Sequence, residues 1–276
     1  MTGWLSSPKA NMTQLLIDAD FTLFQACSAV EREAVFTNEA GHAVHVLNSA
    51  FDEALDTFTR AVENFKATLY GTEAILVFSG PNNFRKDLWD GYKAHRKATR
   101  KPLCYWTIID HLRQAGDYRV LSEDCLEGDD YIGILATRPS SVRRVVISDD
   151  KDMQTLPNVE LYRMGNLMQT TVDSAEEFWL YQTLMGDATD GYKGCPGIGD
   201  VGAKKVLAKP GDPWANVVQA YEDAYRKDKD PTKAKWLGME PEELAVLNAR
   251  LARILRHTDW EGNTRRPILW TPESPE

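Results

Sequence analysis

Four short apolar runs, separated by helical patterns, constrain the fold of this 276-residue chain more than any other feature. They read LLIDADF, AILVF, YRVL and VRRVVIS, at residues 15–21, 74–78, 118–121 and 142–148. Apolar runs of this length are typical of buried strands. Because helices separate them, the strands should run parallel. The sequence therefore predicts an α/β fold with a mostly parallel central sheet flanked by helices.

The helical segments follow from apolar residues at steps of three and four. This spacing predicts a helix over residues 46–69. Ser174 and Glu177 stand in capping-box spacing, which predicts that a helix begins there and leads to Asp187. Further helices are expected over residues 201–208, 214–226 and 241–256.

Acidic residues follow three of the four runs and precede a glycine-rich link. Asp18 ends the first run, LEGDD follows the third, SDDKD follows the fourth, and GDATD comes directly before the link. Because the carboxyl ends of parallel strands meet at one edge of a sheet, we expect these acids to converge. The candidates are Asp18, Glu127, Asp129, Asp130, Asp150, Asp152, Asp187 and Asp190.

Eight neighbouring carboxylates cannot all stay ionised without counter-charge. A general acid/base pair, as in glycoside hydrolysis, needs only two carboxyl groups. Mg²⁺ instead takes oxygen ligands and keeps waters that a substrate phosphate can replace. Two such ions about 3.5–4 Å apart stabilise both oxygens of a phosphoryl displacement. Taken singly, each motif is more often a helix cap or a solvated turn; together they indicate phosphodiester hydrolysis.

The glycine-rich link, GCPGIGDVGAKK, has the composition of a phosphate-binding loop. Gly197, Gly199 and Gly202 allow backbone N–H groups to face a phosphate at a helix N-terminus, where Lys204 and Lys205 add positive charge. Carbonyl groups of the same link could hold K⁺. The alternative is an ordinary connection between two helices.

A basic stretch at residues 85–101 offsets a formal net charge of -9 that argues against a nucleic-acid partner. Tyr92, Lys93 and Arg96 fall within one helical turn, so an aromatic ring can stack on an unpaired base while the cations bind phosphate. The alternative is a solvated basic helix. The candidate DNA contacts in this stretch are Arg85, Tyr92, Lys93, Arg96 and Lys97.

Other polar groups are assigned no site. His42 and His45 lack a third ligand nearby and are expected at the surface or in packing. No secretory signal or membrane span is apparent, which favours a cytoplasmic protein. Four cysteines without CxxC spacing are expected as reduced thiols. They are Cys27, Cys104, Cys125 and Cys195.

The ordered motifs, from the strand-end Asp18 through LEGDD, DKD and GDATD to GCPGIGDVGAKK, resemble the structure-specific 5′ nucleases. This family includes flap endonucleases, the 5′ nuclease domains of bacterial DNA polymerases and phage 5′–3′ exonucleases. The motifs FQACSA, YKAHRKATRKP and GDATDGY resemble the gene 6 type exonucleases of T7-like phages in particular. The match extends from about residue 15 to residue 209.

The resemblance implies an α/β nuclease core of the PIN or flap endonuclease type over residues 1–180, with a basic helical arch at about 84–105. A C-terminal helical region, 181–276, would contain a helix-three-turn-helix that grips duplex DNA. By matching position, the acids would be ligands of two metal ions, with Asp130 supporting them. Lys93 and Arg96 would polarise the scissile phosphate and Tyr92 would stack on the end nucleotide. The implied catalytic residues are Asp18, Lys93, Arg96 and Asp150.

One position departs from the family pattern. The family carries an aspartate just after its second strand, where this chain reads VFSGPNNFR. Ser79 and Gly80 cannot replace a carboxylate. We therefore expect one metal ion to bind more weakly, or through Asn82 or Asn83.

These features together predict a Mg²⁺-dependent exonuclease, with Mn²⁺ as a substitute, acting at 5′ ends of duplex DNA, nicks or flaps. RNA primers in RNA/DNA hybrids are a further expected substrate. The protein is expected to be a monomer in the host cytoplasm, with phage replication proteins as partners. One alternative is a catalytically weakened module that binds DNA junctions. Another is a PIN-like ribonuclease, against which the glycine-rich link counts.

Overall fold

The computed structural model describes residues 12–98, 100–230, 232 and 234–273. Its centre is a six-stranded sheet in which neighbouring strands pair in parallel except for the last pair. In spatial order the strands are β5 (Arg119–Leu121), β4 (Glu73–Val77), β1 (Thr13–Asp18), β6 (Arg143–Ile147), β7 (Glu160–Arg163) and β8 (Asn166–Gln169). The predicted α/β fold with a mostly parallel sheet is confirmed.

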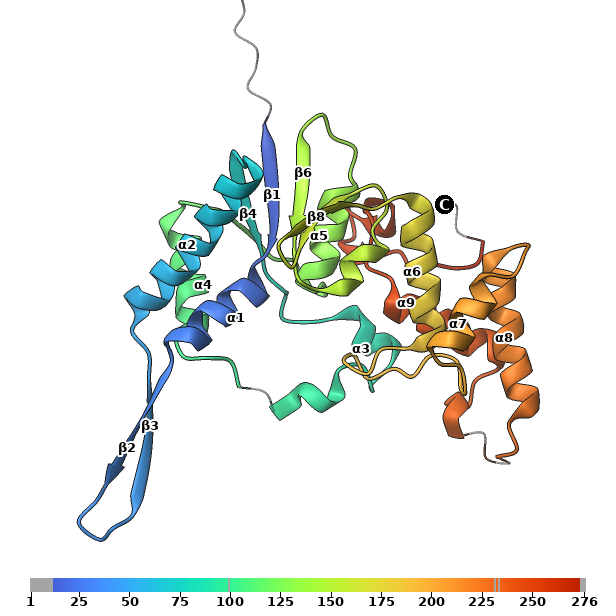
Figure 1. Ribbon diagram of the computed structural model, residues 1–276, viewed down its shortest axis with the longest axis horizontal. Coiled ribbons are helices and arrows are strands. Elements are labelled where there is room, and N and C mark those ends of the chain that lie inside the picture. The colour runs from blue at the N-terminus through green and yellow to red at the C-terminus, as the bar shows by residue number, and fades with distance from the viewer. Residues whose placement is uncertain (1–11, 99, 231, 233, 274–276) are drawn as a thin grey trace, which may run out of the picture.

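Helices cover both faces of this sheet (Figure 1). On one side lie α1 (Ala19–Val30), α2 (Phe51–Leu69) and α4 (Tyr105–Ala115), and on the other lie α5 (Gly128–Thr137) and the 3-10 helix η2 (Lys151–Thr155). Side chains alternate between the faces along β1, as the pleat of a strand requires. Leu15 and Ile17 pack against the first group of helices, and Leu16 packs against the second.

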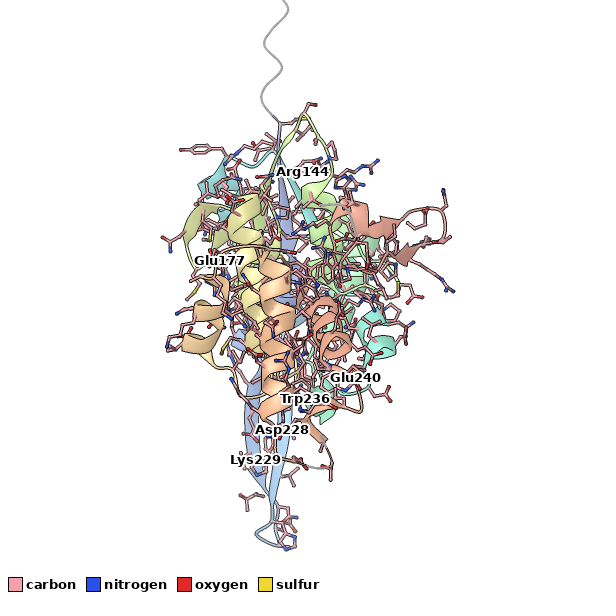
Figure 2. All side chains as sticks on the ribbon, turned by 90° about the vertical axis from the view of Figure 1, so that its right-hand side faces the viewer. Arg144, Glu177, Asp228, Lys229, Trp236 and Glu240 are labelled. Atoms are coloured by element: carbon pink, nitrogen blue, oxygen red, sulfur yellow. The ribbon has the colours of Figure 1, made fainter. Side chains whose placement is uncertain are left out.

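The C-terminal helices share a hydrophobic cluster of their own. They are α6 (Val172–Met185), α7 (Asp200–Leu207), α8 (Pro213–Lys227) and α9 (Pro241–Ala252). Trp236 packs at the C-terminal end of α8, where it is fully buried and donates its indole N–H to Asp228 at 2.9 Å (Figure 2). A helix-three-turn-helix remains a prediction; the described link between α6 and α7 contains an antiparallel bridge between Asp187 and Tyr192.

A β-hairpin replaces the start of one predicted helix. The helix expected over 46–69 begins at Phe51, because the residues before it form β3 (Ala43–Asn48), which pairs with β2 (Arg32–Thr37). This hairpin projects from the rest of the molecule (Figure 1). Val44 and Val46 share one face at two-residue spacing, and such β-branched alternation favours a strand. His45 is exposed beside Glu33, as a surface assignment requires.

The remaining elements are short. They are α3 (Phe84–Leu88), η1 (Ala94–Ala98), η3 (Ala234–Trp236), η4 (His257–Asp259), β9 (Trp260–Glu261) and β10 (Arg266–Pro267). The last predicted helix was too long, because α9 ends at Ala252 and the chain then becomes extended. Within the described ranges, the helices are all too short or too polar to cross a bilayer.

Candidate active site

A cavity of about 640 Å³ opens at the carboxyl ends of the parallel strands. Asp18 reaches it from the end of β1, where it also caps α1. Glu127 and Asp129 reach it from the start of α5, and Asp150 from the turn after β6. The carboxylates lining the cavity are Asp18, Asp20, Glu127, Asp129, Asp149 and Asp150. The structure therefore brings three of the four predicted acidic segments into one crevice.

In the part of the chain that the structure describes, Glu127 alone among these six carboxylates has a Lys or Arg at ion-pair distance. Asp18 is only 9% exposed and accepts a hydrogen bond from Ser148 Oγ at 2.8 Å. Burial and the negative charge of Asp20 raise the pKa of Asp18 to about 6. Burial, Asp18 and Asp150 likewise hold the pKa of Asp129 well above its usual range. In the described part of the chain, no Lys or Arg forms an ion pair with Asp18, Asp129 or Asp150.

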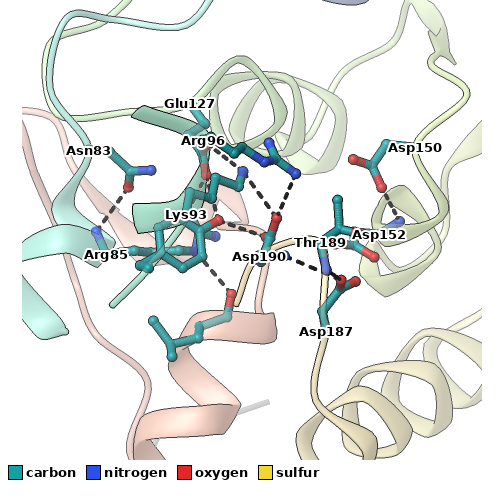
Figure 3. A network of polar contacts seen from close by, with 12 residues as sticks. Asn83, Arg85, Lys93, Arg96, Glu127, Asp150, Asp152, Asp187, Thr189 and Asp190 are labelled. Atoms are coloured by element: carbon teal, nitrogen blue, oxygen red, sulfur yellow. Dashed lines mark hydrogen bonds and ion pairs between the residues drawn. The ribbon is translucent and has the colours of Figure 1, made fainter. Parts of the chain in front are cut away.

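Lysine and arginine neutralise the next group of acids (Figure 3). Lys93 Nζ lies 2.6 Å from Glu127 Oε1 and 3.5 Å from Asp190 Oδ1, and Arg96 lies 3.2 Å from the same Asp190 oxygen. Burial would raise the pKa of Glu127, but Lys93 and Arg85 outweigh it and lower this pKa to about 2. The two predicted cations thus contact carboxylates directly beside the cavity.

The DKD motif supplies a further cation that the sequence analysis missed. Lys151 pairs with Asp187 and lies 3.7 Å from Asp152, which joins η2 to the start of the α6–α7 link. Burial and Asp150 raise the pKa of Asp152 to about 6. Burial would also raise the pKa of Asp187, but the hydrogen bond from Lys151 lowers it. Asp187 also accepts a hydrogen bond from the N–H of Thr189 at 2.6 Å (Figure 3).

Arg85 and Asp130 belong to the interior, which contradicts a DNA contact for Arg85 and a place for Asp130 among the metal ligands themselves. A supporting role for Asp130 remains a prediction. Two Arg85 nitrogens donate to the two oxygens of Asp130 at 2.6 and 2.8 Å, and both side chains are almost wholly buried. Arg85 also binds the carbonyls of Leu251 and Arg253, and Asp130 accepts from the N–H of Leu255. These contacts occupy both charged groups, so Arg85 cannot reach DNA and Asp130 cannot reach the cavity.

The prediction that Tyr92 stacks on a base is also wrong. Its side chain is 2% exposed, and its hydroxyl oxygen lies 2.8 Å from Glu127 and 2.9 Å from Asp190, so the two carboxylates share its one hydrogen. A ring in this position has no face free for a base. The one-turn spacing to Lys93 and Arg96 did not reveal which side of the segment faces solvent. The side chain of Lys97 lies outside the described part of the chain.

Asp20 occupies the region where the second strand lacks an acid. One Asp20 oxygen accepts the N–H of Ser79 at 2.7 Å, and the other accepts the hydroxyl of Tyr105 at 2.5 Å. Asn82 and Asn83 do not fill this place: the first donates to Asp124 and the second caps α3. The available sequence signal was the DAD spacing at the end of the first strand.

The glycine-rich link lies apart from the cavity lining. Gly197 has φ +83°, which favours glycine, and a Cβ at Gly197 or Gly199 would meet nothing within 4 Å. The backbone there is accessible from outside, and Gly199 caps α7 without a side-chain hydrogen bond. By contrast, a Cβ at Gly202 would lie 3.2 Å from Ile198. Lys204 and Lys205 are exposed, and Lys204 pairs with Asp200.

The acid set suits a hard divalent cation that keeps part of its water. Crowded, desolvated carboxylates with raised pKa values gain from a nearby positive charge, and oxygen donors are those that Mg²⁺ prefers. Among the described residues, however, no three His, Cys, Asp or Glu side chains are arranged as a ready-made metal site. Water-mediated contacts would bridge that gap, because Mg²⁺ sheds its hydration shell reluctantly.

An α/β sheet with a carboxylate-lined crevice and adjoining cations defines a hydrolase suited to phosphodiester bonds. The family model of the 5′-3′ exonuclease N-terminal resolvase-like domain matches residues 13–180. The chain belongs to this family, and it is a nuclease of the 5′–3′ exonuclease type.

Individual relatives agree with this assignment. The chain is 33% identical to the exodeoxyribonuclease of Enterobacteria phage T3 and 32% identical to the exonuclease of Escherichia phage T7; each match covers 94% of this chain and 93% of the relative. The bacteriophage T5 flap endonuclease, solved with DNA and metal ions, shares the fold at a TM-score of 0.59 and 16% identity. That match covers 87% of this chain and 88% of the T5 chain.

Proposed function

We propose that this protein is a metal-dependent exonuclease that removes nucleotides from the 5′ ends of duplex DNA, including ends at nicks and flaps. The observation that carries the proposal is the group formed by Asp18, Asp129 and Asp150, which lines one cavity without ion pairs in the described chain. Within this group, Asp18 and Asp129 are desolvated. Two cations, Lys93 and Arg96, line the same cavity. Carboxylates beside cations fit a phosphate held by metal ions.

The proposed cofactor is a pair of Mg²⁺ ions, for which Mn²⁺ would substitute. Asp18, Glu127, Asp129 and Asp150 would hold them, directly or through water, with Asp152, Asp187 and Asp190 at the edge of the site. When bound, the metal would activate water and stabilise charge on the phosphate. The related T5 5′-exonuclease has been solved with zinc, at a TM-score of 0.55 and 17% identity.

The chain's own residues would orient the substrate. Lys93 and Arg96 would exchange part of their contact with Glu127 and Asp190 for the oxygens of the scissile phosphate. Both cations are held at this edge by those carboxylates, so little reorganisation is needed when the phosphate arrives. Lys151 would keep the carboxylates of Asp152 and Asp187 in place.

Duplex DNA would lie across the C-terminal side of the crevice. The accessible backbone at Gly197 and Gly199, with Lys204 and Lys205, fits a sugar-phosphate strand without reading its bases. A helix-three-turn-helix and a K⁺ ion at this link belong to the same proposal, as do RNA/DNA hybrids as substrates. The similarity to phage T3 and T7 exonucleases supports a role in phage DNA replication inside the host cell.

A time course on 5′-labelled blunt, nicked and flap duplexes tests the proposal. Mg²⁺ should produce short 5′ products, a chelator should stop their release, and Asp150→Asn should bind DNA without shortening it. Mobility shifts in the wild-type protein without cleavage would instead identify a DNA-junction-binding module. Cleavage of single-stranded RNA alone would identify a ribonuclease.

A further inference from the structure

One large aromatic side chain faces the crevice from the solvent side. Trp106 is 65% exposed and lines the same cavity as Asp18 and Asp129. It is the only tryptophan in the described ranges that is exposed; the others are buried or partly buried. Because this exposed indole lines the cavity of the carboxylates, its ring is accessible to a ligand bound there.

An edge-to-face contact links the indole to a buried neighbour. Trp106 lies in the first turn of α4, next to Tyr105, which is 1% exposed. The two rings meet edge to face, with centroids 5.1 Å apart and an interplanar angle of 88°. Because the Tyr105 hydroxyl donates to Asp20, and Asp20 also binds the backbone of Ser79, the aromatic pair is tied to the acidic wall of the cavity.

Cations accompany the indole around the same cavity. Lys101 and Arg113 line it on the α4 side, in addition to Lys93 and Arg96. An accessible aromatic face beside several cations is the arrangement that binds unpaired nucleotides, by stacking on the base and contacting the phosphate. A terminal base pair exposes only its outer face, whereas a base outside the double helix can turn a whole face towards a side chain in the cavity wall. The fitting ligand is therefore an unpaired nucleotide at a DNA end.

We propose that Trp106 stacks on the base of an unpaired 5′-terminal nucleotide and thereby positions the adjoining phosphate at the carboxylates. This inference rests on the proposed nuclease function and assigns the base-stacking role to a residue of α4. Tyr105 is a positioning residue that acts through Trp106. Stacking is independent of base identity because each base has an aromatic face; the expected selection is for an unpaired end over a fully paired one.

A duplex with a one-nucleotide 5′ flap carrying 2-aminopurine at the terminal position tests the inference. The Asp150→Asn background keeps this DNA intact. Binding should quench the 2-aminopurine fluorescence, and Trp106→Ala should abolish the quenching and weaken flap binding about tenfold or more. Affinity for the same duplex without a flap should change less than twofold. Trp106→Phe should retain most of the quenching, and Tyr105→Phe should retain only part of it.

A matched control is Tyr70→Asn, which removes an exposed aromatic side chain after α2, where β4 is about to begin. Its left-handed backbone, φ 56°, is one that asparagine tolerates. This variant should quench like the parent. Full quenching by Trp106→Ala would overturn the inference and leave the nuclease function intact. Wild-type protein that neither binds nor cuts these DNAs would overturn both.

Discussion

The carboxylate of Asp20 accepts a hydrogen bond from the backbone N–H of Ser79 at 2.7 Å, joining the start of α1 to the turn after β4. Asp20, which closely follows β1, thus lies against the turn after β4, and that turn carries no acidic residue of its own. We infer that Asp20 compensates for the carboxylate missing at this turn.

Asp20→Asn should therefore weaken divalent metal binding by roughly 10- to 100-fold, the effect typical of groups that support metal ligands. Titration of the metal-free protein with Mn²⁺, followed by electron paramagnetic resonance of the free ion, measures this directly. Asp124→Asn removes an exposed carboxylate outside the crevice and should leave the affinity unchanged. Equal affinities for both variants would show that Asp20 has no role in metal binding.

Lys93→Ala should lower the rate of cleavage by roughly 10²- to 10³-fold, as loss of one donor to a developing oxyanion does. Affinity for duplex DNA should change little, because Lys93 would contact the scissile phosphate alone. Single-turnover kinetics on a 5′-labelled duplex separates the two quantities. Lys86→Ala, from the same basic stretch, is the control. A drop in DNA affinity that accounts for the whole loss of rate would contradict the assigned role.

Asp18→Asn should stabilise the metal-free protein at alkaline pH. The pKa of Asp18 rises from 3.8 to about 6 in the folded chain, so ionisation of this group lowers the free energy of unfolding. The loss begins near pH 4 and is complete above about pH 6. The variant should therefore gain on the order of 3 kcal/mol above about pH 7 and nothing below about pH 4. Thermal unfolding in chelator across this range measures the gain.

An exposed carboxylate provides the comparison for that experiment. Asp56→Asn on α2 should change the unfolding free energy by less than about 0.5 kcal/mol at either pH. Because the Oδ1 of asparagine can still cap α1 while its amide N–H donates to the Ser148 hydroxyl, the gain in Asp18→Asn reports loss of charge. A destabilised Asp18→Asn protein at alkaline pH would refute the sign of this prediction.

Arg85→Met should destabilise the fold by about 3–5 kcal/mol, because it leaves the buried carboxylate of Asp130 without its cation. Chemical unfolding measures this loss. Arg60→Met provides the comparison: it breaks an exposed pair with Asp56 and should cost less than about 1 kcal/mol. Similar unfolding free energies for the two variants would contradict a structural role for the buried pair.

The strands of the core were predictable because parallel strands buried on both faces are continuous apolar runs. The convergence of Asp18, Glu127, Asp129 and Asp150 followed from the same reasoning, since their segments end at one edge of the sheet. The β2–β3 hairpin was missed because its strands bury little and carry no continuous run. The apolar residues at the end of β3 happen to continue the three- and four-residue spacing of α2, so the predicted helix began too early.

Partner choice among charged groups could not be predicted. Arg85 and Arg96 belong to one basic stretch, yet the first is 3% exposed and the second is exposed. What separates them is contact with α9 and the chain after it, 166 and more positions later. Tyr92 was misassigned for the same reason. Local spacing shows which side chains share a face, and only the tertiary fold shows what that face meets.

The contacts of Arg85 and Asp130 with Leu251, Arg253 and Leu255 also impose an order on biosynthesis. Until those residues have left the ribosome, the Arg85 guanidinium and the Asp130 carboxylate lack their backbone partners. Arg85 lies 3.6 Å from Glu127, so the wall behind the crevice is completed last. A nascent chain therefore completes the contacts behind its carboxylate-lined crevice only after residues 251–255 have been synthesised.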